Sequence, residues 1–199
     1  MNEEISLDIL SLSAAATKAF EQACDGLPRV RVVEKRWENC PAHDCFVTAA
    51  NSYGLMSAGT DAAVVARFGR EIEQNIQTQI LNQYWGEQPI GSAFLVSSGS
   101  AWCPWVVHAP TMRMPGDISA TENVYQATKA ALLAIRAHNC SNDVPIRTVL
   151  IPAMGTGFGQ MSNEEAARQM AVAWSFFLEP PYPPNWDRAI AREKRIRGR

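Results

Sequence analysis

The chain has 199 residues, 47% of them hydrophobic, which is enough for one domain with one sizeable core. Its net charge of −2 does not favour binding to nucleic acid or to an anionic membrane surface. A site for a phosphorylated ligand would therefore have to be built locally, from backbone groups or from a few side chains.

The predicted elements alternate along the chain between short apolar runs and longer segments of helical periodicity. We predict strands at residues 5–12, 30–33, 45–49, 93–97, 105–109 and 148–151. We predict helices at residues 14–24, 60–68, 71–85 and 119–138, and a further helix that opens at residue 162. Ser119 with Glu122, and Ser162 with Glu165, have the spacing of capping boxes. Nearly all-apolar strands between helices predict an α/β domain, a three-layer α/β/α sandwich with a mixed central sheet.

The last twenty residues differ in composition from the rest. Residues 180–184 read Pro-Pro-Tyr-Pro-Pro, which cannot continue a helix, and the chain is basic beyond Trp186. We predict a single domain over residues 1–179 and a Pro-rich, basic tail over residues 180–199. A solvated and partly mobile terminus is the expected state of this tail, with a contact to an acidic partner as the alternative.

The first loop with a chemical signal follows the strand predicted at residues 45–49. Asn51-Ser52-Tyr53-Gly54-Leu55-Met56-Ser57-Ala58-Gly59 leads into a helix that starts near Thr60. Small residues let a ligand approach the backbone, and a helix start offers unpaired N–H groups to an anion. Asp61 falls in the first helical turn, where a carboxylate can also serve only to stabilise the helix.

The second loop follows the strand predicted at residues 148–151 and reads Pro152-Ala153-Met154-Gly155-Thr156-Gly157-Phe158-Gly159-Gln160. Alternating glycines can direct successive N–H groups into one concavity, a nest for phosphate, although a plain tight turn explains them equally well. The pair of loops is more informative, because ligands of open α/β sheets bind where the carboxyl ends of strands converge. We therefore predict a crevice lined by residues 51–61 and 152–160.

Three segments of the chain together resemble the signature of macrodomains, which are ADP-ribose-binding modules. They are Thr48-Ala49-Ala50-Asn51-Ser52, Gly59-Thr60-Asp61 and the second loop, and Asp61 follows Asn51 by ten residues as in that family. Ala109-Pro110-Thr111-Met112-Arg113 is similar to a segment of a bacterial branch. The resemblance covers roughly residues 28–178. Some macrodomains hydrolyse ADP-ribose from modified proteins. The resemblance therefore implies ADP-ribose or an ADP-ribosylated protein as the partner of this chain.

The resemblance also implies a set of site residues. Gly155, Thr156, Gly157 and Gly159 would hold the diphosphate, helped by Ser57, Ala58 and Gly59, while Ala50 would lie beside the ligand. Phe158 would pack against the ribose distal to the adenine, and Asn51 would hydrogen-bond the same ribose. Asp61 matches the acidic residue that orients or activates water in hydrolytic members. Asp61 and Asn51 are thus the catalytic candidates, since cleavage of a glycosidic bond benefits from a nearby carboxylate.

Three departures from the family pattern leave alternatives open. Thr48 replaces the first Asn of the family's Asn-Ala-Ala-Asn, Ser57-Ala58 replaces two glycines, and Arg36, with Glu38 close by, stands where an adenine-recognising Asp is usual. A hydrolase of ADP-ribosylated proteins therefore stands beside a non-catalytic ADP-ribose reader and a diverged scaffold for protein contacts.

We expect neither a cofactor nor a metal. Cys40-Pro41-Ala42-His43-Asp44-Cys45 offers possible metal ligands but no regular tetrahedral spacing. The five cysteines form no Cys-x-x-Cys pair, no apolar run approaches the roughly 18 residues of a membrane span, and the acidic first residues do not resemble a signal peptide. These features predict a cytoplasmic protein without membrane attachment.

Overall fold

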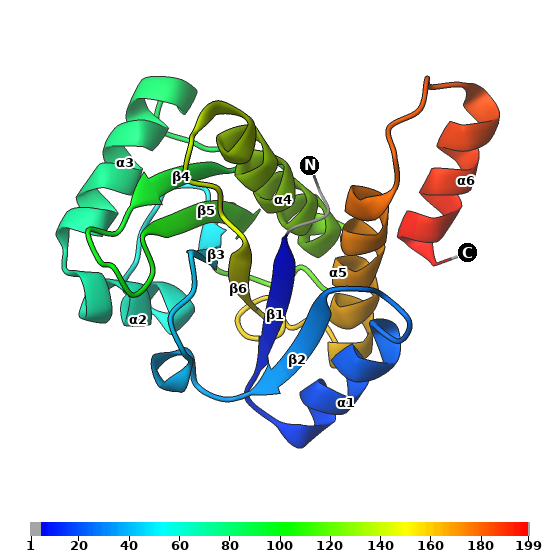
Figure 1. Cartoon of the computed structure of the whole chain (residues 1–199), viewed down its shortest axis with the longest axis horizontal. Coiled ribbons are helices and arrows are strands. Elements are labelled where there is room, and N and C mark those ends of the chain that lie inside the picture. The colour runs from blue at the N-terminus through cyan, green and yellow to red at the C-terminus, as the bar shows by residue number, and fades with distance from the viewer. Residues whose placement is uncertain (1–4, 199) are drawn as a thin grey trace.

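The computed structural model describes residues 5–198, and a six-stranded sheet forms its centre (Figure 1). The strand order across the sheet is β2-β1-β6-β3-β5-β4. The strands are β1 (Ser6–Ser11), β2 (Val30–Glu34), β3 (Cys45–Asn51), β4 (Phe94–Ser97), β5 (Trp105–Met112) and β6 (Thr148–Pro152). Four of the pairings are parallel and the β4–β5 pairing is antiparallel, so the sheet is mixed as predicted.

Helices cover both faces of this sheet (Figure 1). They are α1 (Ala14–Ala23), α2 (Gly59–Phe68), α3 (Glu71–Tyr84), α4 (Asn123–Ser141), α5 (Asn163–Leu178) and α6 (Trp186–Arg197), with a short 3-10 helix at Trp37–Asn39. One core cluster joins the sheet to α1, α4 and α5, and a second joins it to α2 and α3. The predicted three-layer α/β/α fold is thereby confirmed.

Alternation along the strands divides the core between the two layers. In β3, Cys45 and Val47 contribute to the cluster under α1, α4 and α5, whereas Phe46 contributes to the cluster under α2 and α3. In α3 the isoleucines Ile72, Ile76 and Ile80 recur every four residues and are all buried. This spacing puts them on one helical face, which is why the segment folds as a helix against the sheet.

An ionic cluster fastens the segment between β2 and β3 onto the sheet. The buried ring of His43 approaches a carbonyl of Pro41 through Nδ1 (2.8 Å) and the carboxylate of Asp8 through Nε2 (3.0 Å). Both partners can accept a hydrogen bond, and the bond to Asp8 raises the pKa of His43, so the contacts favour the protonated ring. Burial by itself would raise the pKa of Asp8, but hydrogen bonds from His43 and Arg31 outweigh it and lower that pKa to about 2. The segment fixed in this way carries residues 36–38, which line the crevice described below.

The start of α4 differs from the sequence prediction. Ser119 and Glu122 do not form a capping box: the Ser119 N–H bonds the side chain of Asp117 at 2.8 Å, and the helix begins only at Asn123. The preceding turn is bound elsewhere, because the Ile118 N–H donates to the carbonyl of Gly159 at 2.9 Å. A tertiary contact to the second loop therefore overrides the local capping signal. The box predicted at Ser162 does supply its cap, since the Ser162 hydroxyl accepts from the Glu165 N–H at 3.2 Å.

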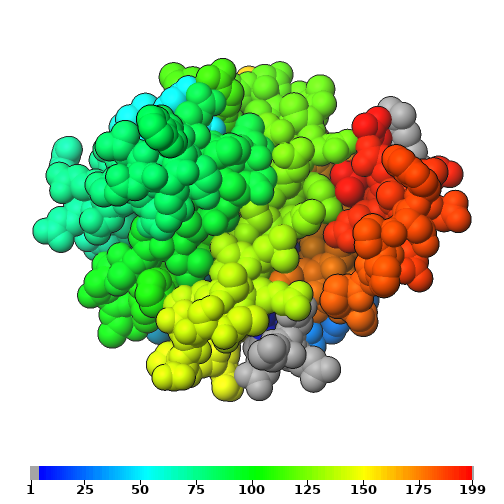
Figure 2. Space-filling view, turned by 90° about the horizontal axis from the view of Figure 1, so that it is seen from above, coloured from blue at the N-terminus to red at the C-terminus, as the bar shows by residue number. Residues whose placement is uncertain are grey.

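Residues beyond the proline-rich stretch form a helix, which the sequence analysis did not predict. Asn185 caps α6 by accepting a hydrogen bond from the Arg188 N–H at 2.9 Å, and Ile196 is buried against α4 and α5. The guanidinium groups of Arg192 and Arg195 lie 3.9 and 4.2 Å from the ring centroid of Phe176. Figure 2 shows this C-terminal segment, in orange and red, packed beside α4 at the side of the molecule. The basic residues are therefore partly engaged by α5. The mobility of the terminus and the boundary between domain and tail at residue 179 remain predictions.

Within residues 5–198, no helix combines the length and apolar character that crossing a bilayer requires.

Candidate functional site

The two loops singled out in the sequence converge at one edge of the sheet. β3 and β6 are parallel neighbours, so Asn51 at the end of β3 and Pro152 at the end of β6 lie at the same edge. A pocket of about 280 Å³ opens between the loops that follow them, and we call it the Asp61 pocket. Of the predicted site residues, its lining includes Ala50, Asn51, Ser57, Ala58, Gly59, Asp61, Gly155, Gly157, Phe158 and Gly159.

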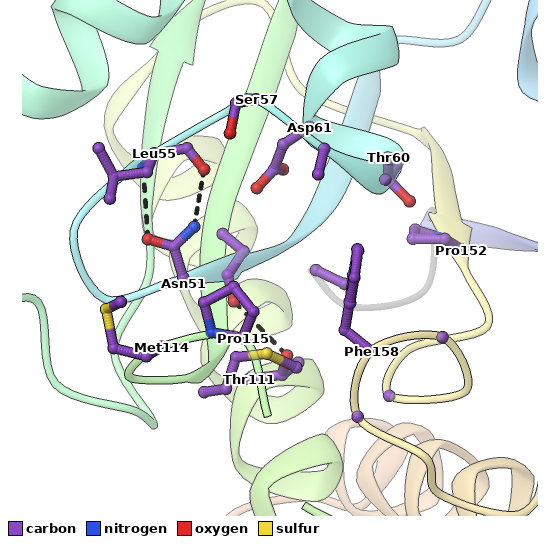
Figure 3. Close-up of a pocket in the computed structure, with 18 of the residues that line it drawn as sticks. Asn51, Leu55, Ser57, Thr60, Asp61, Thr111, Met114, Pro115, Pro152 and Phe158 are labelled. Atoms are coloured by element: carbon purple, nitrogen blue, oxygen red, sulfur yellow. Dashed lines mark hydrogen bonds between the residues drawn. The ribbon is translucent and has the colours of Figure 1, made fainter. Parts of the chain in front are cut away.

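A second hollow continues from the first. This Trp37 groove, of about 890 Å³, is lined by residues 36–38, by α1, and by Thr156, the remaining predicted site residue. The two hollows share Gly59, Thr60, Gly157 and Phe158, so they form one crevice. The side chain of Phe158 is 59% exposed where they meet. In Figure 3 it lies across the Asp61 pocket from Asn51 and Asp61.

Backbone N–H groups from both loops are free at this crevice. Within the described part of the chain, Gly59, Thr60 and Asp61 donate no backbone hydrogen bond, and no side chain caps α2. The N–H groups of Thr156, Gly157 and Phe158 are likewise without an acceptor among residues 5–198. Unpaired amides at a helix start and in a glycine-rich turn attract anions. The arrangement suits a negatively charged ligand. Among the described residues, Asp61 is the one charged side chain that lines the Asp61 pocket, so no lysine or arginine contributes to it.

The glycines of the second loop have different structural demands. Gly155 has a φ of +79°, and a Cβ there would lie 2.6 Å from Cγ2 of Val124. A Cβ on Gly159 would lie 2.5 Å from the carbonyl oxygen of Gly155 and 2.8 Å from Cγ1 of Ile118. At Gly157, in contrast, a Cβ would meet no atom within 4 Å. The fold therefore requires glycine at 155 and 159, whereas the open space at 157 is free for a ligand.

This difference gives a test of the loop geometry by stability alone. We expect Gly159→Ala to lower the free energy of unfolding by about 2–3 kcal/mol, because the new methyl group must displace backbone. Gly157→Ala is the matched control and should change it by less than about 0.5 kcal/mol. Urea denaturation of the two variants measures both values, and equal losses would contradict the geometry described here.

Asn51 organises its own loop. Its Oδ1 accepts a hydrogen bond from the Tyr53 N–H at 3.1 Å. Figure 3 shows its two bonds to Leu55: Oδ1 accepts from the N–H at 3.3 Å, and Nδ2 donates to the carbonyl at 2.8 Å. A side-chain amide carries two N–H donors, so one donor of Asn51 is left for a ligand.

Asp61 lies in the first turn of α2 and is only 6% exposed. Its Oδ1 accepts a hydrogen bond from the hydroxyl of Thr48, which lies beneath it in β3. The pKa of Asp61 is raised to about 7. Burial is the largest cause, the charge of Glu73 adds to it, and the hydrogen bond from Thr48 partly opposes both. A carboxyl group with this pKa can accept or release a proton near neutral pH.

On the apolar side of the pocket mouth, sequence reasoning covered Leu55 within residues 51–61 but did not identify Met114 and Pro115. Leu55, Met114 and Pro115 line the Asp61 pocket on the side of Asn51 (Figure 3). Met114 is 58% exposed at this mouth. The signal that could have found it is position, because residues 113–115 directly follow β5, the parallel neighbour of β3.

An ion pair anchors this side of the mouth. Arg113 Nε and Nη2 donate to the carboxylate of Glu87 at 2.6 and 3.0 Å, and Nη2 also donates to the hydroxyl of Tyr53 at 3.2 Å. The ion pair ties the turn after β5 to the segment after α3, and the bond to Tyr53 ties it to the loop after β3. Arg113 therefore has structural partners at the edge of the site.

Residues 40–45 are occupied by structural contacts. His43 is bound by Asp8 and Pro41, and Cys45 is buried in β3. Among the described residues, no three His, Cys, Asp or Glu side chains are arranged to hold a metal ion.

Comparison with known proteins identifies similar chains. A model of the Macro domain family matches residues 47–170, which is more than half of the sequence. An uncharacterised protein of Aquifex aeolicus is 38% identical over 127 residues, covering 64% of this chain and 70% of the relative.

Two solved structures share the fold. The macrodomain of Mycobacterium tuberculosis DarG superposes with a TM-score of 0.58 at 20% identity, covering 76% of this chain and 95% of that one. A variant of the Oceanobacillus iheyensis macrodomain, solved with ADPR, superposes with a TM-score of 0.60 at 17% identity, covering 91% of this chain and 83% of that one. At these identities the likeness extends to the fold alone.

Proposed function

The chain belongs to the macro domain family, and from this premise we propose that it binds ADP-ribose in the crevice between the loops after β3 and β6. The observation that carries the proposal is the set of unpaired backbone N–H groups in two loops whose residues line one crevice. A diphosphate bound by these amides needs no lysine or arginine, which agrees with the lining of the Asp61 pocket.

The remaining parts of the ligand fit on either side of the diphosphate. The terminal ribose would enter the Asp61 pocket, pack against Phe158 and accept or exchange hydrogen bonds with the free N–H of Asn51 and the carboxyl of Asp61. The adenosine would occupy the larger Trp37 groove, where Arg36 and Glu38 stand at the lining. The Oceanobacillus iheyensis relative solved with ADPR is consistent with this assignment of ligand class.

We further propose that the chain hydrolyses ADP-ribose from an ester-linked acceptor on a modified protein. Water would attack the anomeric carbon of the terminal ribose, and the bond from that carbon to the ester oxygen would break. The electron pair of the broken bond would leave with the acceptor carboxylate, and the proton of the water would pass to Asp61. A carboxyl group with a pKa of about 7 suits this exchange.

A reader that binds without turnover is the second candidate. Asn51 favours it, since the amide oxygen is already bound by two N–H groups of its own loop and only one donor remains for a ribose. A catalytic site would need this limited contact to hold the ribose in a reactive position.

We also propose a cytoplasmic location. All five cysteines are free, and four of them are buried. This usage fits a reducing compartment.

Calorimetry tests the binding proposal directly. We expect ADP-ribose to bind with a micromolar dissociation constant, and AMP, which lacks the second phosphate and the terminal ribose, to bind at least tenfold more weakly. NAD carries nicotinamide on the anomeric carbon of the terminal ribose. Its affinity therefore reports whether the Asp61 pocket has room for a group attached to that carbon. Absence of heat with ADP-ribose at millimolar concentration would refute the proposal.

A further inference from the structure

Thr48 occupies an unusual place beneath the site. It lies in β3 and is fully buried, with an exposed fraction of 0%. Like Phe46, it is an even-numbered residue of the strand and faces the layer of α2 and α3. Its hydroxyl donates to Oδ1 of Asp61 in the first turn of α2. The bond joins the sheet to the helix that forms one wall of the Asp61 pocket.

The two oxygens of Asp61 have different surroundings. Oδ1 is bound by Thr48, whereas no hydrogen bond to Oδ2 is found within residues 5–198. Asp61 lines the pocket, and Figure 3 shows its carboxyl group directed into the space between Ser57 and Asn51. The carboxyl group is thus held on one side and open to a ligand on the other.

Few charges act on this carboxyl group. β3 presents the neutral Thr48, and the end of β5 presents the neutral Thr111 and Met112. The charge that reaches it comes from Glu73 in α3, which is itself fixed by a hydrogen bond from the Met56 N–H at 2.9 Å. Burial and this neighbouring carboxylate both favour the protonated form of Asp61, and the hydroxyl of Thr48 opposes them.

We propose that Thr48 is a positioning residue of the site: its hydroxyl holds the carboxyl group of Asp61 so that Oδ2 is directed toward the bound ribose. That a ribose binds beside Asp61 rests on the proposed function. That Thr48 orients the carboxyl group of Asp61 rests on the hydrogen bond between them. A hydroxyl at this position supplies one donor to the carboxylate, and the side chain fills the space between strand and helix.

Titration of Asp61 by carbon NMR tests the contact without reference to activity. The side-chain carboxyl signal is assigned by its loss in Asp61→Asn, and its midpoint is compared in the wild type, Thr48→Val and Thr48→Ser. Valine has the shape of threonine without the donor, so we expect its midpoint to rise by about one to two pH units, the effect of one hydrogen bond to a charged group. Serine keeps the donor and should stay within about half a unit of the wild type. Equal midpoints in the wild type and Thr48→Val would overturn the inference.

A functional readout separates this inference from the proposed function. Release of ADP-ribose from a mono-ADP-ribosylated protein should rise with pH, and the rising limb should shift upward in Thr48→Val but not in Thr48→Ser. Thermal unfolding of the two variants checks that both remain folded. A shifted NMR midpoint with an unshifted activity limb would overturn the role of Thr48 in the site. If the wild type shows neither binding nor release at any pH, the proposed function fails, and the NMR midpoints alone decide whether Thr48 controls Asp61.

Discussion

Replacing Gly157 with valine is expected to weaken ADP-ribose binding by at least about 100-fold while leaving the fold intact. Gly157 lines both hollows, its N–H is free, and the space at its Cβ position is empty. A branched side chain would therefore fit the protein but occupy the room that the diphosphate needs. A loss of this size corresponds to about 2.7 kcal/mol of binding free energy.

The measurement is calorimetry of ADP-ribose with the wild type, Gly157→Val and Gly116→Val. Gly116 is a matched control, because it lies outside both linings and a Cβ there would meet only the Met114 carbonyl oxygen, at an ordinary 3.8 Å. Unchanged affinity in Gly157→Val would show that the diphosphate does not lie on the second loop. Equal urea midpoints for all three proteins would establish that any loss of binding is local.

Asp61→Asn is expected to slow the release of ADP-ribose from a modified protein by about 100-fold or more, the usual contribution of general acid–base catalysis. Asparagine keeps the shape of the side chain and can still accept the bond from Thr48, so the affinity for free ADP-ribose should change only a few-fold. Single-turnover release and calorimetry on the same preparations measure the two effects. Undiminished release would exclude Asp61 as the group that takes the proton, and the exposed Asp25→Asn serves as the control.

The same variant should change how stability depends on pH. The pKa of Asp61 in the folded chain, about 7, lies above the ordinary value of 3.8, so the folded state holds the proton more tightly. The stability due to this proton is complete below about pH 4 and is lost as pH rises through 7. Relative to Asp61→Asn, the wild type should therefore lose on the order of 2–4 kcal/mol of unfolding free energy between pH 4 and pH 8. Urea denaturation at both pH values measures it.

The strands and most helices could be predicted because each carries a local signal that agrees with its tertiary environment. Phe46, Val47 and their neighbours form a short apolar run, and β3 is indeed covered on both faces. The start of α4 could not be predicted from local sequence. Ser119 has the spacing of a helix cap, but the turn that contains it is held to the second loop by the hydrogen bond from the Ile118 N–H to the Gly159 carbonyl. α6 was missed because the prolines before it suggested a break, although Asn185 was a usable sign of a helix start.

The candidate site was predictable in outline but not in its internal contacts. Sequence order placed Asn51 and Gly157 after two strands, and the structure shows that those strands are neighbours. The bond from Thr48 to Asp61 depends on where α2 crosses β3, which no local pattern specifies. The same holds for Met114, whose exposure follows from the turn after β5.

Because β3 and β6 are neighbours, ligand binding between their loops would stabilise the whole folded domain. Residues 51–61 and 153–160 are distant in sequence, so no short fragment of the chain contains both walls of the crevice. An unfolded chain has no crevice. If the chain binds ADP-ribose as proposed, this ligand at one hundred times its dissociation constant would stabilise the native state by about 2.7 kcal/mol. A cell rich in this nucleotide would therefore keep the protein from unfolding and from the proteases that act on unfolded chains.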